Sequence, residues 1–275
     1  MRLGLTSLAG EPRPVAQVDG ELLPLRTAPG STLLELIVAG EIPPIDDGAG
    51  ALIGVRLAAP LRPPKIVAIG LNYLDHIRET GLEKPERPLV FAKFPSSVIG
   101  DGEEIVIDRS LSARVDWEVE LAVVIGRRMS RLSPQDALGR VFGYTVANDV
   151  SARDLQFSDG QWVRAKSLDT FCPLGPLVVT ADEIPDPQRL ALRTRVNGET
   201  VQDSNTSEML FGVAELLSFC SHSFVLEPGD VVLTGTPWGC GEFSSPPRSL
   251  HGGDVVEVEV EQIGRLRNPV VELGG

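Results

Sequence analysis

The segment DWEVELAVVIG, residues 116–126, decides the fold, because it has the pattern of a β-strand that is buried along most of its length. Its second half, LAVVIG, carries no polar side chain, and a continuous apolar run is typical of a strand covered on both faces. Its first half holds two glutamates, Glu118 and Glu120. Side chains two residues apart in a strand lie on the same face. We therefore expect both carboxylates, with Asp116 beside them, to point the same way.

Two interpretations of this glutamate pair are open. One is a half-exposed strand with a solvated acidic face. The other is a metal site, because carboxylates at the entrance to a buried strand need a counter-charge to stay ionised, and Mg²⁺ binds carboxylate oxygens. Asp149, which ends the predicted strand FGYTVAN, could be the third ligand, although an Asx turn or a helix cap would also use an aspartate there. No histidine lies near either motif, which disfavours zinc, copper and nickel.

Strands dominate the rest of the chain, and turn signals such as Asn197-Gly198 separate them. The predicted strands include KIVAIGL, PLVFAKF, EEIVID, FGYTVAND, LALRTRVNGETV, DVVLTGTP and DVVEVEVEQIG. Runs of strands with scattered helices predict an α+β fold that is mainly β, with much antiparallel sheet. A Pro-rich stretch, APLRPPK, marks a boundary near residue 60. We expect a small N-terminal domain over 1–60 and a main domain over 61–275.

Helix caps and apolar spacing predict four short helices. The first, in GSTLLELIVAG, would be capped by Ser31 and end at the glycine that closes the segment. The second, residues 73–80, would be capped by Asn72 and stop at Gly81. Two more are predicted in SPQDALGRV, with Ser133 as the cap, and in MLFGVAELLSFCSHS.

Composition excludes several classes of partner. The formal net charge is −13 and there is no basic block, so nucleic acid and anionic membranes are poor partners. The three cysteines are far apart and form no CxxC motif, which fits a reducing compartment better than a disulfide framework or a zinc site. No stretch approaches the roughly 20 apolar residues that cross a bilayer, and the first residues do not have the pattern of a signal peptide. We expect a cytoplasmic protein.

The segment NYLDHIRET places His76 and Glu79 three residues apart, on one face of a short helix. A histidine oriented by a carboxylate can act as a base, although an exposed helix can also carry such a pair by chance. His222 and His251 have the character of structural or exposed residues. The glycine-rich turn in VVLTGTPWGCG could offer backbone amides to an anion, but the signal is weak by itself.

The net charge of the predicted site indicates what kind of small molecule it would bind. Three carboxylates and one Mg²⁺ would leave the cluster at one net negative charge. Arg153, four residues after Asp149, and Lys166, in VRAKSLDT, would turn it to one net positive charge. Such a site suits an anionic chelator, for example a 2-oxo acid.

Seven segments together resemble the fumarylacetoacetate hydrolase family, and the resemblance covers about residues 60–275. They are GLNYLDHIRE, FAKFPSSVIG, DWEVELAVVIG, NDVSARDLQ, AKSLDTFCPLGP, RVNGE and LTGTPWGCG. The resemblance implies a mixed β-sandwich roll with a small N-terminal domain, a homodimer, and Mg²⁺ or Mn²⁺ as the cofactor. By position it implies these roles: metal ligands Glu118, Glu120 and Asp149; catalytic residues His76, Glu79 and Lys166; substrate contacts Arg153, Gln156, Gly235 and Thr236.

These observations favour hydrolysis of a carbon–carbon bond in an acylpyruvate or a related β-diketo acid. His76, oriented by Glu79, would activate water for attack on a metal-chelated substrate, and Lys166 with the amides near Gly235 and Thr236 would stabilise the developing negative charge. The same metal–enolate site could instead decarboxylate oxaloacetate or isomerise a dienedioate. A further alternative is a non-catalytic module that binds a metal–dicarboxylate complex.

Overall fold

The computed structural model describes residues 1–274, and strands make up most of its regular structure. Within these residues a sheet of eleven strands forms the larger layer. Its members are β1 (Arg2–Leu8), β2 (Glu11–Val18), β3 (Glu21–Pro24), β4 (Leu57–Ala58), β5 (Ile66–Gly70), β6 (Leu89–Lys93), β7 (Val98–Ile99), β10 (Val119–Ile125), β11 (Val141–Asn148), β13 (Cys172–Thr180) and β16 (Val231–Leu233). The main path runs β3-β2-β1-β13-β11-β10-β16-β5-β6.

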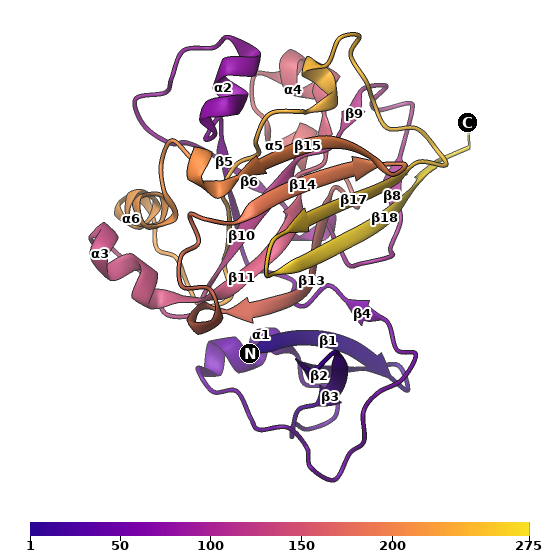
Figure 1. Ribbon diagram of the computed structural model, residues 1–275, viewed down its shortest axis with the longest axis vertical. Helices are drawn as coiled ribbons and strands as arrows, with labels where there is room; N and C mark the ends of the chain where they lie inside the picture. Colours follow the sequence, from indigo (N-terminus) through magenta and orange to yellow (C-terminus); the bar gives the residue numbers. More distant parts are fainter. Residues whose placement is uncertain (275) are drawn as a thin grey trace.

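A second sheet of five strands, counted over the same residues, packs against the first in the order β15-β14-β17-β18-β8. Its strands are β8 (Ile105–Ile107), β14 (Ala191–Val196), β15 (Glu199–Asn205), β17 (Val255–Val260) and β18 (Gly264–Glu272). A short pair joins β9 (Val115–Asp116) to β12 (Ser151–Ala152). Figure 1 shows the smaller sheet lying across the strands of the larger one. The prediction of an α+β fold, mainly β, is confirmed.

The helices are short and lie around the sheets rather than between them (Figure 1). They are α1 (Leu33–Ala39), α2 (Leu74–Thr80), α3 (Pro134–Ala137), α4 (Arg153–Asp159), α5 (Val163–Lys166) and α6 (Val213–Ser223). Single 3₁₀ turns are η1 (Pro95–Ser97), η2 (Leu138–Arg140), η3 (Ala181–Glu183), η4 (Thr206–Glu208) and η5 (Gly241–Phe243). Among residues 1–274, no helix has the length and apolar character needed to cross a membrane.

The sequence of strand β10 is mostly apolar because the strand contributes side chains to two separate cores. It is hydrogen-bonded to β11 on one side and β16 on the other. Val119, Leu121 and Val123 belong to the core between the two sheets. Ala122 and Val124 belong to a second core on the opposite face, which also contains side chains of β1 and α1. Alternate side chains of a strand point to opposite faces, so both faces must be apolar here.

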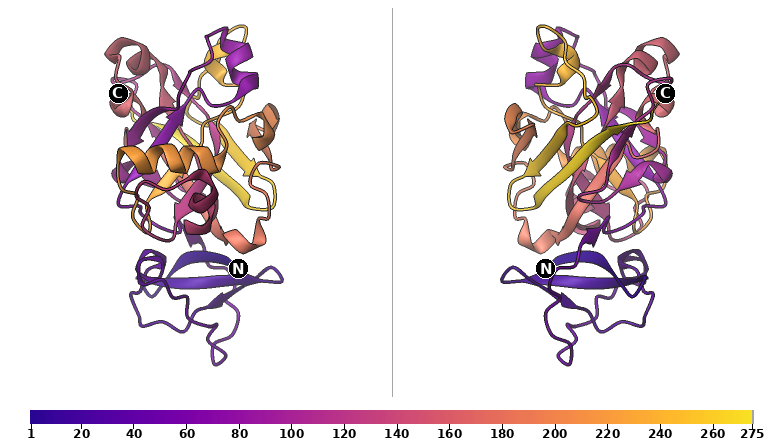
Figure 2. Two further views of the ribbon diagram at one scale, coloured as in Figure 1. Left: turned by 90° about the vertical axis from the view of Figure 1, so that its left-hand side faces the viewer. Right: turned by 90° about the vertical axis from the view of Figure 1, so that its right-hand side faces the viewer.

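The N-terminal segment folds into the β1–β3 strands and α1, at the end of the molecule opposite α2 and α4 (Figures 1 and 2). Strand β1 joins the large sheet through two residue pairs with β13, Arg2 with Val179 and Leu3 with Val178. The predicted domain boundary near residue 60 stays a prediction.

Three details of the predicted helices need correction. Thr32, not Ser31, caps α1. The Thr32 hydroxyl accepts a hydrogen bond from the Glu35 amide, and the Glu35 carboxylate accepts one from the Thr32 amide. Helix α2 begins at Leu74 and the side chain of Asn72 does not cap it; that side chain is buried and bonds the main chain of Phe211 and Thr234 instead. Helix α6 starts only at Val213, after Gly212.

Candidate metal centre and active site

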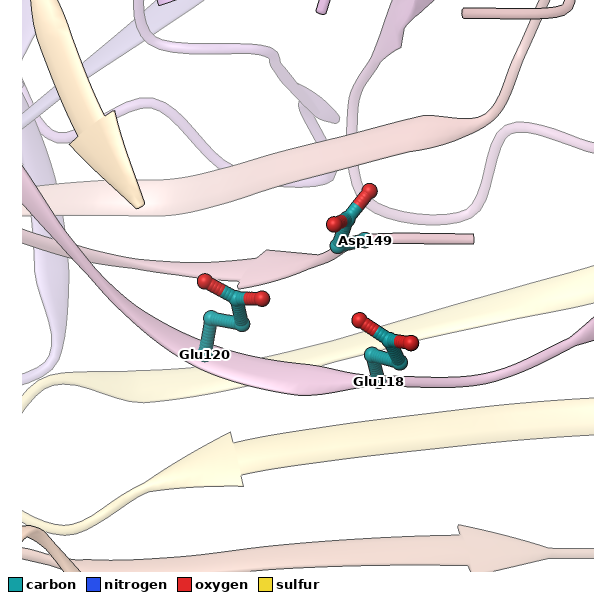
Figure 3. Close-up of side chains that lie close together, drawn as sticks. All are labelled: Glu118, Glu120 and Asp149. Atoms are coloured by element: carbon teal, nitrogen blue, oxygen red, sulfur yellow. The ribbon is translucent and has the colours of Figure 1, made fainter. Parts of the chain in front are cut away.

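Three buried carboxylates meet where β10 begins and β11 ends. Glu118, Glu120 and Asp149 each offer an oxygen within 4.8 Å of the others, and at most 5% of each residue is exposed. Figure 3 shows the two glutamates side by side on one segment of the chain, with Asp149 facing them from just beyond the end of the neighbouring strand. The two glutamates share a face because they are two residues apart, and Asp149 is added by the antiparallel pairing of β10 with β11. The structure thus brings the three predicted ligands together.

The strand is interrupted at Trp117 and Glu118, between β9 and β10. There the amide of Glu118 donates to the side chain of Asn148 at 3.0 Å, and the amide of Val119 donates to Gln202 at 3.0 Å. Side-chain amides therefore replace the main-chain partners that a continuous ladder would supply. Asn148 and Gln202 are both buried.

Two buried lysines balance part of this negative charge. Lys166 Nζ lies 2.7 Å from Glu118 Oε2 and 2.8 Å from Asp149 Oδ2. Lys93 Nζ lies 2.6 Å from Asp149 Oδ1 and also donates to the carbonyl of Lys166. Lys93 is 1% exposed, and sequence reasoning did not single it out. Its signal was a lysine at the end of the apolar strand LVFAK, because a lysine that becomes buried there is tolerated only when its charge is paired.

Arg153 links the cluster to a fourth carboxylate. Its guanidinium lies 2.7 Å from Glu118 Oε1 and 2.7 Å from Asp116 Oδ2, and it donates to Gln156 Oε1 at 2.9 Å. Asp116 also accepts from the amides of Gly241 and Glu242, at 2.7 and 3.1 Å. Asp116 therefore orients Arg153 and anchors η5, and it does not join the three ligand carboxylates.

The three carboxylates differ in their electrostatic surroundings. Burial raises the pKa of Glu118, but Lys166 and Arg153 outweigh it and bring that pKa to about 2. Burial, Asp149 and Glu118 together raise the pKa of Glu120 well above its ordinary value. Burial lowers the pKa of Lys166, yet Asp149 and Glu118 raise it overall. Glu120 is thus the carboxylate whose ionised form most needs an additional cation.

The residues fit a hard divalent cation. The four carboxylates carry one more charge than Lys93, Lys166 and Arg153 together, so a divalent cation would reverse the net charge from −1 to +1. This net charge equals the one counted from the sequence. That count left out Asp116 and Lys93, and the charges of these two residues cancel. The ligand atoms are all carboxylate oxygens, as Mg²⁺ and Mn²⁺ prefer. In residues 1–274 this is also the one group of three side chains with metal-ligand geometry.

The predicted dyad is formed on α2. His76 Nδ1 lies 2.8 Å from Glu79 Oε2, and Glu79 Oε1 accepts from the Gly239 amide at 2.9 Å. The imidazole packs against the Phe243 ring, with the ring centroids 5.3 Å apart. His76 is 7% exposed. Because Nδ1 bonds Glu79, Nε2 is the nitrogen left for chemistry.

His76 of the dyad and Glu118 of the acidic cluster line one cavity of about 230 Å³, to which Arg153, Gln156 and Lys166 also contribute. Thr236 lines it as predicted. Gly235 is different: its amide donates to Glu120 Oε2 at 2.7 Å. In this structure the amide therefore positions the Glu120 carboxylate, and its predicted contact with a substrate stays a prediction.

Comparison with known proteins agrees with this geometry. Residues 65–271 match the family model described as fumarylacetoacetate (FAA) hydrolase C-terminal. The mitochondrial oxaloacetate tautomerase fahd2 of Xenopus laevis is 49% identical over 220 residues, 79% of this chain and 69% of that protein. A structure described as fumarylacetoacetate hydrolase from Exiguobacterium antarcticum is 40% identical with a TM-score of 0.92, covering 99% of this chain and 100% of that one. A 5-carboxymethyl-2-hydroxymuconate delta-isomerase from Mycobacterium smegmatis is 40% identical with a TM-score of 0.84, and each chain is covered completely.

The chain belongs to the fumarylacetoacetate hydrolase family. It is an enzyme of that superfamily, whose relatives include oxaloacetate tautomerases and isomerases. The non-catalytic binding module considered from the sequence is therefore set aside.

Proposed function

We propose that this enzyme catalyses keto–enol tautomerisation of a 2-oxo acid, with a divalent cation such as Mg²⁺ or Mn²⁺. The observation that carries the proposal is that His76, which is hydrogen-bonded to Glu79, lines the same cavity as Glu118 of the buried carboxylate cluster. Relatives at 48–49% identity are named oxaloacetate tautomerases, which supports this reaction over the hydrolysis favoured from the sequence. Oxaloacetate and acylpyruvates are the first compounds to assay.

The carboxylates of Glu118, Glu120 and Asp149 would hold the cation. When bound, it would withdraw electron density from the 2-oxo group and make the adjacent C–H bond more acidic. Lys166 and Arg153 supply positive charge at the same end of the cavity and would attract the carboxylate of the substrate. Gln156 accepts from Arg153 through Oε1, so its amide nitrogen is left to donate to the substrate.

His76 performs the proton transfer. Nε2 takes a proton from the carbon next to the oxo group, and Glu79 stabilises the imidazolium through Nδ1. The same nitrogen returns the proton to the former oxo oxygen, which gives the enol. One C–H bond breaks, one O–H bond forms and no water is consumed. Phe243 packs against the imidazole and shields this transfer from solvent.

Hydrolysis of an acylpyruvate is the second candidate, and one observation favours it. The Exiguobacterium structure that covers 99% of this chain is described as a fumarylacetoacetate hydrolase. The same His76 could take a proton from water, whose oxygen would then attack the distal carbonyl. The carbon–carbon bond would break to give a carboxylic acid and a 2-oxo acid.

The two reactions leave different products. Tautomerisation predicts Mn²⁺-dependent exchange of the C3 hydrogens for deuterium in D₂O, followed by NMR, with the carbon skeleton intact. His76→Gln should lower the exchange rate by about 10²–10⁴-fold, the usual contribution of a general base. His222→Gln, at an exposed position on α6, is the matched control. Stoichiometric cleavage of acetylpyruvate to acetate and pyruvate would select hydrolysis, and carbon dioxide release from oxaloacetate would select decarboxylation.

A further inference from the structure

Helix α2, which carries the proposed base His76, is too short to fix its own position. It has seven residues, Leu74–Thr80, and isolated helices shorter than about 12 residues are marginal in water. The side chain of its N-cap residue, Tyr73, makes no capping hydrogen bond. The place of the imidazole in the cavity therefore depends on contacts between α2 and the rest of the protein.

The carboxylate of Asp75, the residue before His76, makes several of these contacts at the start of the helix. Its Oδ1 accepts hydrogen bonds from the His76 amide at 2.7 Å and from the Trp238 amide at 3.4 Å. Its Oδ2 accepts from the Ser204 hydroxyl. Ser204 lies on β15, and Trp238 lies in the turn between β16 and η5. One carboxylate thus ties the first turn of α2 to two other segments of the site.

A second carboxylate holds the same face of α2 one helical turn further on. Glu79 is four residues after Asp75, so the two side chains are neighbours on the helix surface. Glu79 Oε1 accepts from the Gly239 amide at 2.9 Å, while its Oε2 bonds the His76 imidazole. The amides of Trp238 and Gly239 follow each other in the chain and are bound by carboxylates one helical turn apart. In sequence, His76 lies between these two attachments.

The turn that receives the two carboxylates is itself fixed to β15. The indole Nε1 of Trp238 donates to the Asp203 carbonyl at 3.1 Å. Gly239 packs so closely on this strand that a Cβ atom there would come within 2.1 Å of the Val201 carbonyl oxygen. A helix docked on this turn therefore has its position set by the main chain of the smaller sheet.

We propose that Asp75 is a positioning residue for His76: by docking the start of α2 on β15 and the adjoining turn, it sets where Nε2 lies in the cavity. The inference rests on the proposed function, because it takes His76 to be the group that transfers the proton. It adds a residue that is outside the cavity lining of the described chain. A shift of about 1 Å in the position of a reacting group can lower a rate about 10²-fold.

Two substitutions separate the docking contacts from the charge of Asp75. In Asp75→Asn the side-chain oxygen can still accept from the two amides, and the NH₂ group can donate to Ser204 Oγ. The hydrogen bonds can therefore survive although the charge is lost. Asp75→Ala removes both the charge and the hydrogen bonds.

The first measurement is C3 exchange in D₂O with Mn²⁺ at saturating substrate. Asp75→Ala should lower the rate about 10–100-fold, whereas Asp75→Asn should retain most of it. The KM and the Mn²⁺ affinity should not change, because no proposed metal ligand or substrate contact is altered. Arg78→Ala is the matched control, since it breaks an exposed ion pair between the same helix and Glu208 and should have little effect.

Ser204→Ala removes the partner of Asp75 and also tests the inference if Asp75→Ala fails to fold. Its rate should fall by less than that of Asp75→Ala, because the contacts of Asp75 with the two amides remain. Both substitutions break one shared contact, so the loss in the double variant should be smaller than the product of the single losses. Losses that simply multiply would contradict docking through Ser204.

The second measurement does not depend on activity. The chain has three histidines, His76, His222 and His251, so ¹H–¹³C NMR of their rings in the Mg²⁺-loaded protein should give three signals. In Asp75→Ala the His76 signal should shift or broaden, while the signals of His222, on α6, and of His251, after η5, stay in place. A loss of global stability alone would leave all three native signals where they are.

The outcomes distinguish this inference from the proposed function. An unmoved His76 signal in folded Asp75→Ala overturns the inference, and so does an exchange rate no lower than that of Arg78→Ala; both leave tautomerisation standing. Asp75→Asn as slow as Asp75→Ala also overturns it, because the charge and not the docking would then be the cause. If the wild type catalyses no C3 exchange, the proposed function falls, and the His76 signal alone decides whether Asp75 positions the ring.

Discussion

Glu120 is the carboxylate of the proposed metal cluster that has no lysine or arginine partner among the residues that the structure describes. Lys166 and Arg153 contact Glu118, and Lys93 and Lys166 contact Asp149. The Glu120 carboxylate accepts a hydrogen bond from the amide of Gly235 and from no other group among the described residues. Its negative charge is therefore repelled by the other two carboxylates until a cation arrives.

Replacing this carboxylate should separate metal binding from folding. In Glu120→Gln the amide oxygen can still accept from Gly235 while the repelled charge is gone, so the metal-free protein should lose no stability. The wild type should gain about 2.7 kcal/mol at Mn²⁺ one hundredfold above its dissociation constant, and the variant should lose most of that gain. Urea unfolding with and without Mn²⁺ measures both effects. An equal Mn²⁺ gain in wild type and variant would contradict the assigned ligand, and Glu259→Gln on the surface is the control.

Residue-level pattern was sufficient to select the three carboxylates that the structure brings together, and their role as metal ligands stays a prediction. The alternation of a strand puts Glu118 and Glu120 on one face, and Asp149 ends the neighbouring predicted strand. It was not sufficient for Lys93 or for the pairing of Asp116 with Arg153. These contacts join segments far apart in the sequence, and a lysine in a short apolar strand does not reveal its partner.

At the scale of elements, Gln202 on β15 connects the smaller sheet to both sides of the site. Its Oε1 accepts from the Val119 amide at 3.0 Å and from the Thr194 hydroxyl at 2.7 Å. Its Nε2 donates to Thr236 Oγ1 and to the Pro237 carbonyl, each at 3.0 Å. One side chain thus fixes the start of β10, with its two proposed metal ligands, relative to the turn that lines the cavity.

Gln202→Leu keeps a similar volume but leaves several buried polar groups without partners. The variant should lose on the order of 3 kcal/mol in the free energy of unfolding, and its catalytic efficiency should fall even where it is fully folded. Urea unfolding and C3-exchange kinetics measure these losses. Gln135→Leu, on the exposed face of α3, should change neither, and an unaffected Gln202→Leu would show that the connection is dispensable.

At the scale of the whole molecule, α2 and α4, which carry His76 and Arg153, lie at the end remote from the N-terminal strands (Figure 1). Two cores meet at β10, and the charged cluster interrupts the one that β1 and α1 share. Burial on this scale is what brings seven charged side chains close to one another. The homodimer and the cytoplasmic location expected from the sequence stay predictions.

Burial in the folded protein should also make the three cysteine thiols unreactive. Cys172, Cys220 and Cys240 are free and fully buried, and burial raises the pKa of Cys172 and of Cys220 to about 12. Only the thiolate reacts with a disulfide reagent. At pH 8 the native protein should show no fast reaction, and the unfolded protein should show three thiols. A rapid native reaction of even one thiol would mean that this part of the core opens readily.

Local pattern by itself determined the strand-rich class, the Asn197-Gly198 hairpin and the row of glutamates, because alternation, turn residues and burial depend on near neighbours. The hairpin residues adopt the positive φ angles that such turns require. Only the tertiary structure decided which cation faces which carboxylate and that the Gly235 amide serves Glu120. Those features depend on the packing of β5, β6, β10, β11 and α5, and no single segment encodes its distance from the others.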